Sequence, residues 1–368
     1  MTRDPLLIRV DATPAKGYER LMRCLTLAAA VQRRRRPVHF LSQLEPNGLA
    51  MPIKRGGNEW VNMSHPAATP EDAAQVVQQI HRLRPAAVVV DDADATHEYL
   101  TELGGAGPMM ISIDHLATIR FPSALVINPL LGPSRESYEF EGRTQLLLGR
   151  RYALVSPIIR RNRAQRTQEP PPLAVGNGKA VTGQFRALIS LGDDDPNRQV
   201  LDMAKLLLNT PKIGKVDVAV RREHPDLEAL AAIKDSASDR FDVVHEPAEI
   251  ASRVTRCHFA ITSGGGWSLE LACVGVPQLL ILQNEAHWPN AQRLEEEGCA
   301  TCLGWHENCS AQTVRVAVQN LLTDPLERQA MARCGRKLID GRGPDRLVTA
   351  LEILLSPVRQ VQVEQQAA

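Results

Sequence analysis

Short apolar runs alternate along this chain with longer stretches in which apolar residues recur every three or four positions. The run Leu6–Val10 predicts a buried strand, and the helical spacing of apolar residues within Tyr18–Gln32 predicts an amphipathic helix after it. The same alternation predicts further strands at Val38–Leu41, Ala86–Val90, Met110–Ile113, Leu125–Ile127, Ala187–Leu191, Val216–Val220, Phe241–Val244, Phe259–Thr262 and Gln278–Leu282. Two successive series of strands and helices predict an α/β protein with two doubly wound domains.

One segment interrupts the alternation. Residues 161–182 contain Pro170–Pro172 and Gly176–Lys179, a composition typical of linkers and surface loops. We therefore expect an N-terminal Rossmann-like domain over residues 1–160, a linker or insert over 161–182, and a nucleotide-binding C-terminal Rossmann-like domain over 183–358. The glutamine-rich end, residues 359–368, is expected to be a flexible tail.

Four predicted strands of the first half end on polar side chains, namely Asp11, Asp91, Asp114 and Asn128. In open parallel sheets, ligands bind at the carboxyl ends of the strands. Each of these residues alone is also typical of a turn cap. The four together favour a binding site in this half.

A glycine-rich turn follows the strand Phe259–Thr262 and precedes a predicted helix. Its residues are Ser263, Gly264, Gly265 and Gly266. Glycines let the backbone approach a ligand closely, and the N–H groups of a helix start attract phosphate. Glu270, about one turn into the helix, is placed to accept hydrogen bonds from both hydroxyls of a ribose. The alternative is a tight strand–helix turn with a helix-stabilising acid.

Composition narrows the classes of partner. The chain has 43 basic and 42 acidic side chains, a net charge of +1, so no long-range field attracts nucleic acid. The seven cysteines form no disulfide framework, and Cys299–Cys302 lacks a second pair to complete a zinc site, so we expect neither metal nor cofactor. We find no secretory signal and no stretch of about 18 apolar residues, which predicts a cytoplasmic protein without a membrane span. The oligomeric state is left open, and a monomer agrees with the sequence.

A series of motifs in order resembles a known family. The motifs are Arg9–Thr13, Gly17, Leu21–Ala28, Val88–Asp91, Ser112–Ala117, Ile127–Pro129, Leu148–Leu154, Ser190–Asn197 and the glycine turn with its following polar loop Gln283–Gln292. The turn and loop resemble the donor half of the UDP-N-acetylglucosamine transferases of peptidoglycan synthesis. The whole series, about residues 6–305, resembles the PseG/SpsG family, the UDP-sugar hydrolases of pseudaminic acid biosynthesis.

The resemblance implies a GT-B fold, with two Rossmann-like domains facing across a cleft. It implies release of UDP from UDP-2,4-diacetamido-2,4,6-trideoxy-β-L-altrose by attack of water at the anomeric carbon, in a pathway that serves flagellin glycosylation. By analogy with the family, Gly192 lies near the diphosphate. We further expect Asn290 and Gln292 near the sugar or phosphate, and the N-terminal wall of the site to be lined by Gly17, Arg20, Asp11, Asp91 and Asn128.

The chain departs from the family where the catalytic histidine is expected. The family's G-x-G-H loop falls on Gly17-Tyr18-Glu19-Arg20, so Glu19 replaces the second glycine and Arg20 replaces the histidine. A guanidinium has no lone pair to accept a proton, so Arg20 cannot act as the general base. One hypothesis moves the base to Glu19 or Asp11 and lets Arg20 stabilise the leaving diphosphate. The other hypotheses are a GT-B glycosyltransferase, or a catalytically inactive nucleotide-sugar-binding protein.

Overall fold

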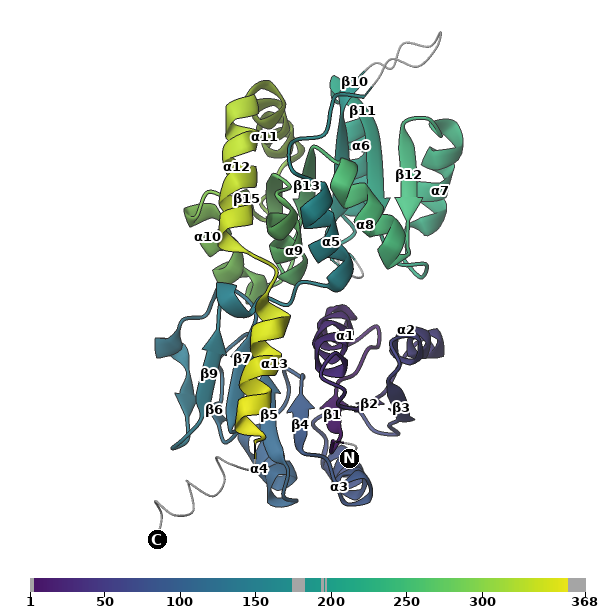
Figure 1. Cartoon of the computed structure of the whole chain (residues 1–368). Coiled ribbons are helices and arrows are strands. Elements are labelled where there is room, and N and C mark those ends of the chain that lie inside the picture. Colours follow the sequence, from purple (N-terminus) through teal and green to yellow (C-terminus); the bar gives the residue numbers. More distant parts are fainter. Residues whose placement is uncertain (1–2, 174–182, 193–194, 196, 357–368) are drawn as a thin grey trace. The chain divides into compact units, whose positions relative to one another are not determined.

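Two parallel β-sheets, each in its own structural unit, organise the chain (Figure 1). The computed structural model describes residues 3–173, 183–192, 195 and 197–356. Unit 1 combines Met1–Leu154 with Arg342–Ala368, and unit 2 is Val155–Gly341. Among the described residues, no helix is both long and apolar enough to cross a membrane.

The sheet of unit 1 has the strand order β3-β2-β1-β4-β5-β7-β9, and every pairing in it is parallel. Its strands are β1 (Leu6–Arg9), β2 (Val38–Ser42), β3 (Glu59–Asn62), β4 (Ala87–Val90), β5 (Met109–Ile113), β7 (Leu125–Asn128) and β9 (Gln145–Leu148). The chain order reverses between β1 and β4, where Arg9 pairs with Val90. Ligands bind at such a switch point in open α/β sheets, just beyond the carboxyl ends of the strands.

Helices cover both faces of this sheet, because alternate residues of the buried strands point to opposite sides. The helices are α1 (Glu19–Gln32), α2 (Ala50–Arg55), α3 (Pro70–Leu83), α4 (His97–Gly105) and α13 (Gly343–Leu354). Leu6 and Ile8 pack toward one side with α1 and α13, whereas Leu7 and Val88 pack toward the other with α3 and α4. Two short strands, β6 (Arg120–Phe121) and β8 (Glu139–Phe140), pair separately.

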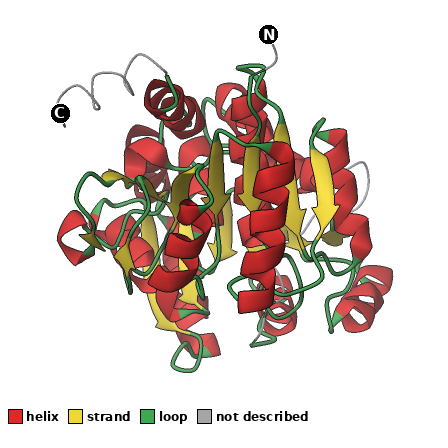
Figure 2. Cartoon of the chain, turned by 90° about the horizontal axis from the view of Figure 1, so that it is seen from below, coloured by secondary structure: helices red, strands yellow, loops and turns green. Residues whose placement is uncertain are grey.

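Unit 2 repeats this architecture with the strand order β12-β11-β10-β13-β14-β15. Its strands are β10 (Gly183–Ser190), β11 (Lys212–Ala219), β12 (Phe241–Val244), β13 (Phe259–Thr262), β14 (Gln278–Leu282) and β15 (Ala300–Trp305). Its helices are α5 (Pro157–Gln165), α6 (Val200–Leu208), α7 (Leu227–Ser236), α8 (Pro247–Arg256), α9 (Gly266–Val274), α10 (Trp288–Glu296), α11 (Ala311–Thr323) and α12 (Pro325–Leu338). Figure 2 shows the strands flanked by helices. The switch point lies between β10 and β13, where Ser190 pairs with Thr262.

The strands expected from the apolar runs are present, with ends that differ by a few residues. The expected domain boundaries differ from the two units at two places. The boundary expected after residue 160 falls inside helix α5. The whole of α5 lies in unit 2, where it contacts α8 and α9. Helix α13, expected in the C-terminal domain, lies in unit 1 against α1. Part of the expected linker, 174–182, and the expected tail, 359–368, lie outside the described residues.

Specific contacts explain why α5 belongs to unit 2. The Arg163 guanidinium donates to the carbonyl oxygens of Cys273 (2.6 Å) and Ile339 (2.9 Å), and Arg336 donates back to the Arg163 carbonyl at 2.9 Å.

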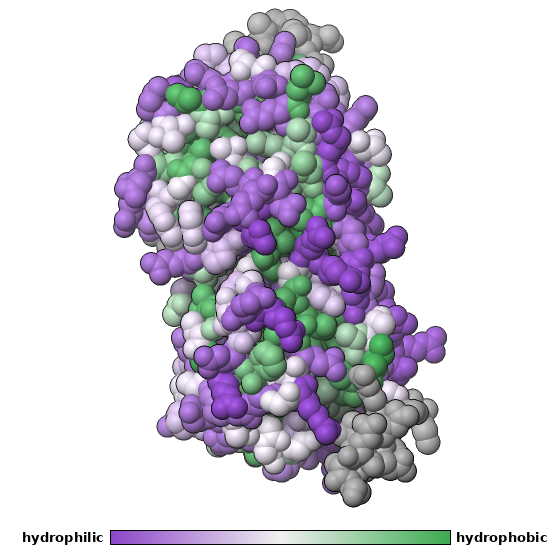
Figure 3. All heavy atoms as spheres, turned by 90° about the vertical axis from the view of Figure 1, so that its left-hand side faces the viewer, coloured by the Kyte–Doolittle hydropathy of each residue, from purple (hydrophilic) through white to green (hydrophobic). Residues whose placement is uncertain are grey.

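The surface seen in Figure 3 mixes hydrophilic residues with smaller apolar areas. The large apolar side chains that are most exposed in the described parts of the chain are Met22, Met51, Leu116, Trp288, Val316, Leu326 and Ile353.

Candidate functional site

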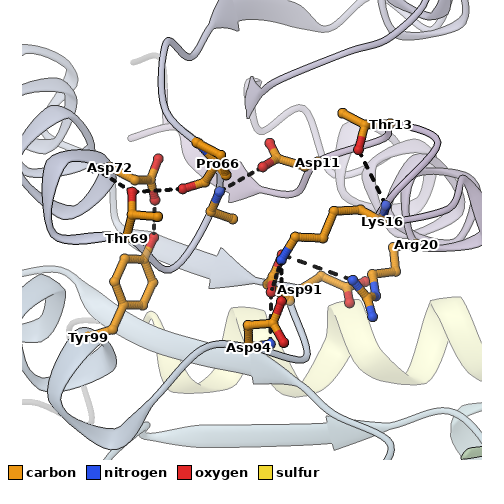
Figure 4. A network of polar contacts seen from close by, with 12 residues as sticks. Asp11, Thr13, Lys16, Arg20, Pro66, Thr69, Asp72, Asp91, Asp94 and Tyr99 are labelled. Carbon is orange, nitrogen blue, oxygen red and sulfur yellow. Dashed lines mark hydrogen bonds and ion pairs between the residues drawn. The ribbon is translucent and has the colours of Figure 1, made fainter.

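The switch point of unit 1 carries a network of charged side chains (Figure 4). Lys16, in the loop between β1 and α1, donates to Oδ1 of Asp92 at 3.0 Å and to Oδ2 of Asp94 at 2.5 Å. Arg20, in the first turn of α1, has its Nη1 atom 4.0 Å from Oδ2 of Asp92. Burial lowers the pKa of Lys16, but its hydrogen bonds to Asp94 and Asp92 outweigh burial and raise that pKa above its usual value. The loop before α1 and the first turn of α1 therefore face the carboxylates that follow β4.

Asp91 belongs to a second ion pair at the same edge. Arg23 donates to it through Nε at 2.6 Å and through Nη2, and the Cys24 thiol lies 3.3 Å from Oδ2. The pKa of Arg23 is raised, since the charge of Asp91 and its hydrogen bond outweigh the effect of burial. Asp91 thus holds α1 against the end of β4.

Asp11 is buried and has a full set of donors. Its Oδ1 accepts from Arg9 Nη1 and from the Gln43 N–H (2.7 Å), and its Oδ2 accepts from Arg9 Nη2 (3.1 Å) and from the Ala67 N–H (2.7 Å). A carboxylate offers about four lone-pair positions, and here four donors occupy them. The arrangement therefore supports Asp11 as an anchor for the loops after β2 and β3, and does not support the expected role of general base.

A buried network extends this anchor. Arg9 donates from Nε to Asp72 at 2.9 Å, and the Tyr99 hydroxyl donates to the other oxygen of Asp72 at 2.6 Å. Burial raises the pKa of Asp72, an effect that Arg9 opposes. Burial and the neighbouring Asp72 also raise the pKa of Tyr99.

The remaining residues expected along this wall organise loops. The Asn128 amide donates to the Gly132 carbonyl (3.1 Å) and contacts the Tyr138 hydroxyl (3.0 Å), while its oxygen accepts from the Leu130 N–H at 2.9 Å. Gly17 has a φ of +74° and its N–H donates to Thr13 at 2.9 Å, which closes the loop before α1. Glu19 begins α1, and its charge contributes to the raised pKa of Arg23.

In unit 2 the glycine turn connects β13 to the start of α9. Helix α9 starts at Gly266 with Gly265 as its N-cap, and it has no side-chain cap and no acidic residue in its first turn. Asn290, fully buried on α10, donates to the carbonyl oxygens of Gly264 (2.6 Å) and Gly265 (3.3 Å). These bonds fix the carbonyls on the side of α10. The N-terminus of α9 therefore keeps the positive end of its dipole uncompensated by an acid of its own first turn.

Two of the glycines meet specific geometric demands. Gly264 has a φ of +83°, and a Cβ atom there would lie 3.0 Å from the Cβ of Ala291. Gly192, at the end of β10, has a φ of +114°, and a Cβ atom there would lie 3.9 Å from the Ser263 hydroxyl. The structure therefore brings Gly192 beside the glycine turn, as the switch point of this sheet requires.

Glu270 and Gln292 have partners that the sequence did not predict. Oε1 of Glu270 accepts a hydrogen bond from the Ser156 N–H, just before α5. One oxygen of the carboxylate is therefore engaged by the backbone rather than held open for a ribose hydroxyl. Gln292 is exposed on α10 and donates to Glu296 at 3.1 Å. Asn290, expected near the sugar or phosphate, braces the turn through its bonds to Gly264 and Gly265.

Sequence reasoning missed several polar residues at both edges. In unit 1 these are Lys16, Arg23 and Asp92. In unit 2, Asn197 donates to Gln283 (2.8 Å), which contacts Gln199 at 3.3 Å, beyond the ends of β10 and β14. Asp92 was visible as the neighbour of Asp91 at a predicted strand end, but nothing in the sequence separates the two aspartates.

One group of potential metal ligands converges in the described parts of the chain, namely Asp195, His224 and Asp226. The Asp226 N–H donates to Nδ1 of His224 at 3.1 Å, so the neutral ring carries its proton on Nε2 and offers no lone pair there. Asp226 is also paired with Arg198. These contacts do not fit a metal site.

Two Rossmann-like units in one chain are the architecture of a GT-B fold, and solved structures share this fold. Acinetobacter baumannii MurG matches with a TM-score of 0.61 at 12% identity, over 95% of this chain and 99% of MurG. A complex of S. aureus MnaA with UDP matches with a TM-score of 0.63 at 12% identity, over 96% of this chain and 97% of MnaA. The spinosyn rhamnosyltransferase SpnG matches with a TM-score of 0.59 at 17% identity, over 95% of this chain and all of SpnG.

Among curated proteins, the chain is similar to the spore coat polysaccharide biosynthesis protein SpsG of Bacillus subtilis (strain 168). The two are 23% identical over 234 residues, which is 63% of this chain. The match spans 65% of the length of SpsG, just under two thirds. A scan against protein-family models finds no match.

Proposed function

We propose that this protein is a UDP-sugar hydrolase of the PseG/SpsG type, which releases UDP from a diacetamido-trideoxy sugar by attack of water at the anomeric carbon. The glycine turn Ser263–Gly266 carries the proposal. It lies at the switch point of its sheet beside Gly192, and it opens a helix whose first turn holds no acid. Backbone N–H groups and the helix dipole at such a place bind diphosphate.

In this proposal, unit 2 binds the nucleotide. The turn and Gly192 bind the diphosphate, and the carboxylate of Glu270, whose Oε1 also accepts from the Ser156 N–H, accepts a hydrogen bond from the ribose. Gln283 and Asn197 supply amides near the same edge for the groups of the sugar, and Gln292 contributes from α10. The choice of uridine follows the resemblance to the PseG/SpsG family and the similarity to SpsG.

Unit 1 supplies a cationic side chain to the proposal. Arg20 is about one quarter exposed (24%) and is held near Asp92, so it supplies a fixed positive charge at the switch point. A guanidinium binds phosphate oxygens in a bidentate manner, and it stays charged throughout the reaction. We assign to Arg20 the stabilisation of the negative charge that develops on the departing diphosphate.

The test is a pair of measurements on the purified chain. Titration calorimetry with UDP measures binding, and incubation with UDP-2,4-diacetamido-2,4,6-trideoxy-β-L-altrose followed by detection of UDP measures hydrolysis. Binding with release supports the hydrolase. A chain that does not bind UDP contradicts the whole proposal.

A glycosyltransferase is the second candidate, and the replacement of the family's histidine by Arg20 is the observation that favours it. A transferase does not need a base for water, but it needs an acceptor. Binding of UDP without its release in water, followed by release when an acceptor sugar is added, would establish this candidate. Binding without release under either condition would indicate a nucleotide-sugar-binding protein.

A further inference from the structure

A pair of stacked tryptophans lies at the carboxyl edge of the unit 2 sheet. Trp288 begins α10, and Trp305 ends β15. Their indole rings stack with centroids 6.2 Å apart and with planes inclined by 21°. Trp305 therefore covers one side of the Trp288 ring, yet Trp288 is still 44% exposed. Because tryptophan is highly buried on average, a stacked pair with one ring this exposed points to a surface that binds a ligand.

The stacked pair lies close to the glycine turn of the same unit. A Cβ atom at Gly264 would lie 3.3 Å from Cδ2 of Leu282, the last residue of β14, and Leu282 pairs with Trp305. Neighbouring strands are about 4.8 Å apart, so the end of β15 lies roughly two strand spacings, about 10 Å, from the end of β13. On α10, Trp288 precedes by two residues the Asn290 that bonds to Gly264. The tryptophans are therefore within reach of a group attached to a diphosphate in the turn.

Amide side chains border the tryptophans. The Gln199 amide donates at 3.0 Å to the carbonyl oxygen of His306, the residue after Trp305. Gln283 accepts from Asn197 (2.8 Å) and donates to Gln199 (3.3 Å), so these amides hold one another in place. Amides carry both donors and acceptors, which suit the hydroxyl and acetamido groups of a sugar. Aromatic rings with a few fixed polar groups beside them are typical of small-ligand sites.

We propose that Trp288 and Trp305 form a platform on which the sugar of the nucleotide-sugar stacks, an inference that rests on the proposed function and deepens it. The C–H groups on one face of a pyranose ring pack on the indole, while the polar groups at the rim of the sugar bond to the amides. A methyl group in place of the hydroxymethyl group buries more apolar surface on the platform. The platform therefore favours 6-deoxy sugars over their hydroxylated counterparts.

The test compares two ligands. Titration calorimetry measures the dissociation constant of UDP and that of an uncleavable UDP-2,4-diacetamido-2,4,6-trideoxy-β-L-altrose, in which a methylene group replaces the anomeric oxygen. Trp288→Ala should weaken binding of this analogue by roughly 3- to 10-fold, the usual strength of an aromatic stacking contact. The same variant should leave the dissociation constant of UDP within a factor of about two, since UDP carries no sugar to stack.

Three further variants complete the comparison. Trp288→Phe keeps an aromatic ring and should recover most of the lost affinity for the analogue. Trp288→Leu keeps apolar bulk without a flat ring, so it should lose the contact too, and it guards against an alanine variant that fails to fold. Leu326→Ala is the control, because Leu326 is another exposed apolar side chain of unit 2 (72% exposed) to which we assign no ligand. It should change neither constant.

The outcomes separate this inference from the proposed function. Folded Trp288 variants that bind UDP and the analogue more weakly by the same factor, or that bind both as wild type does, overturn the inference, because the ring then does not distinguish the sugar. Wild-type protein that binds both ligands but releases no UDP from the cleavable nucleotide-sugar refutes the hydrolase, while the two dissociation constants still decide the stacking. Wild-type protein that binds neither ligand refutes the proposed function and the inference with it.

Discussion

The side-chain amide of Asn290 donates a hydrogen bond of 2.6 Å to the carbonyl oxygen of Gly264, and this contact helps to join helix α10 to the glycine turn. The same nitrogen lies 3.3 Å from the carbonyl oxygen of Gly265. Asn290 is fully buried, so its hydrogen bonds to these carbonyl groups are shielded from solvent. The shape of the proposed diphosphate site therefore depends on a residue that does not itself need to touch the ligand.

Replacement of Asn290 by Ala should destabilise unit 2 and weaken UDP binding together. Leaving buried carbonyl groups unsatisfied costs about 1–3 kcal/mol, which thermal unfolding would detect. Arg293→Ala is the matched control, since Arg293 lies on the exposed side of the same helix and pairs with Glu296. Equal melting temperatures for the two variants would contradict the bracing role.

The fold could be predicted from sequence because buried parallel strands leave continuous apolar runs. Strands β1, β4 and β13 are buried at every position and were expected close to their observed bounds. Strands β3 and β9 lie at sheet edges, where burial is partial, and both were missed: β3 has no continuous apolar run, and β9 has only the three leucines Leu146–Leu148. Helix α13 was assigned to the wrong half because its apolar face does not reveal which core it completes.

The sequence predicted the strand ends and the glycine turn of the candidate site, but not the hydrogen bonds that their side chains make. Strand ends and the glycine turn point to the two switch points, and the structure puts Gly192 beside Ser263 there. The partners of Asp11 come from loops far along the chain, Gln43 and Ala67, which no local pattern encodes. For the same reason the sequence could not separate the engaged Asp91 from Asp92, whose Oδ2 accepts from no described residue.

Glu270 should contribute to UDP binding through its charge. Glu270→Gln retains an oxygen for the Ser156 N–H but removes the charge, so the melting temperature should stay close to wild type. A hydrogen bond to a charged group is worth about 1.5–3 kcal/mol, so calorimetry should show weaker UDP binding by that amount. With 2′,3′-dideoxyuridine diphosphate the difference between wild type and variant should vanish. A difference that persists with the dideoxy ligand would remove the ribose contact from the site.

Helix α13 should stabilise unit 1 although it is distant from that unit in sequence. Leu347 is fully buried in the core that contains α1 and β1. Leu347→Ala should lower the free energy of unfolding by about 2–5 kcal/mol, as expected for a large-to-small change in a core. Ile353 lies on the same helix but is 52% exposed, so Ile353→Ala serves as the control. Denaturant unfolding that shows the same loss for both variants would place α13 outside the core.

Two aspartates on neighbouring strands of unit 2 should respond to pH in opposite directions. Asp217 on β11 is buried, with Arg186 and Arg253 each 3.4 Å from one of its oxygens. Burial raises the pKa of Asp217, against the opposing effect of these arginines. Asp242 on β12 is partly buried, which raises its pKa, but a hydrogen bond from Lys234 and the charges of Lys234 and Arg253 outweigh this and lower it.

The signs follow from proton linkage. A carboxyl whose folded pKa is raised loses stability as the pH rises from the unfolded pKa, about 3.9, through the folded pKa. The free energy of unfolding of wild type, relative to Asp217→Asn, should therefore fall between pH 3 and pH 7. A carboxyl whose folded pKa is lowered contributes stability above the unfolded pKa and loses it as the pH falls, so wild type relative to Asp242→Asn should gain over the same range. Urea unfolding of the three proteins at both pH values measures these differences, and two differences of the same sign would show that burial does not control Asp217.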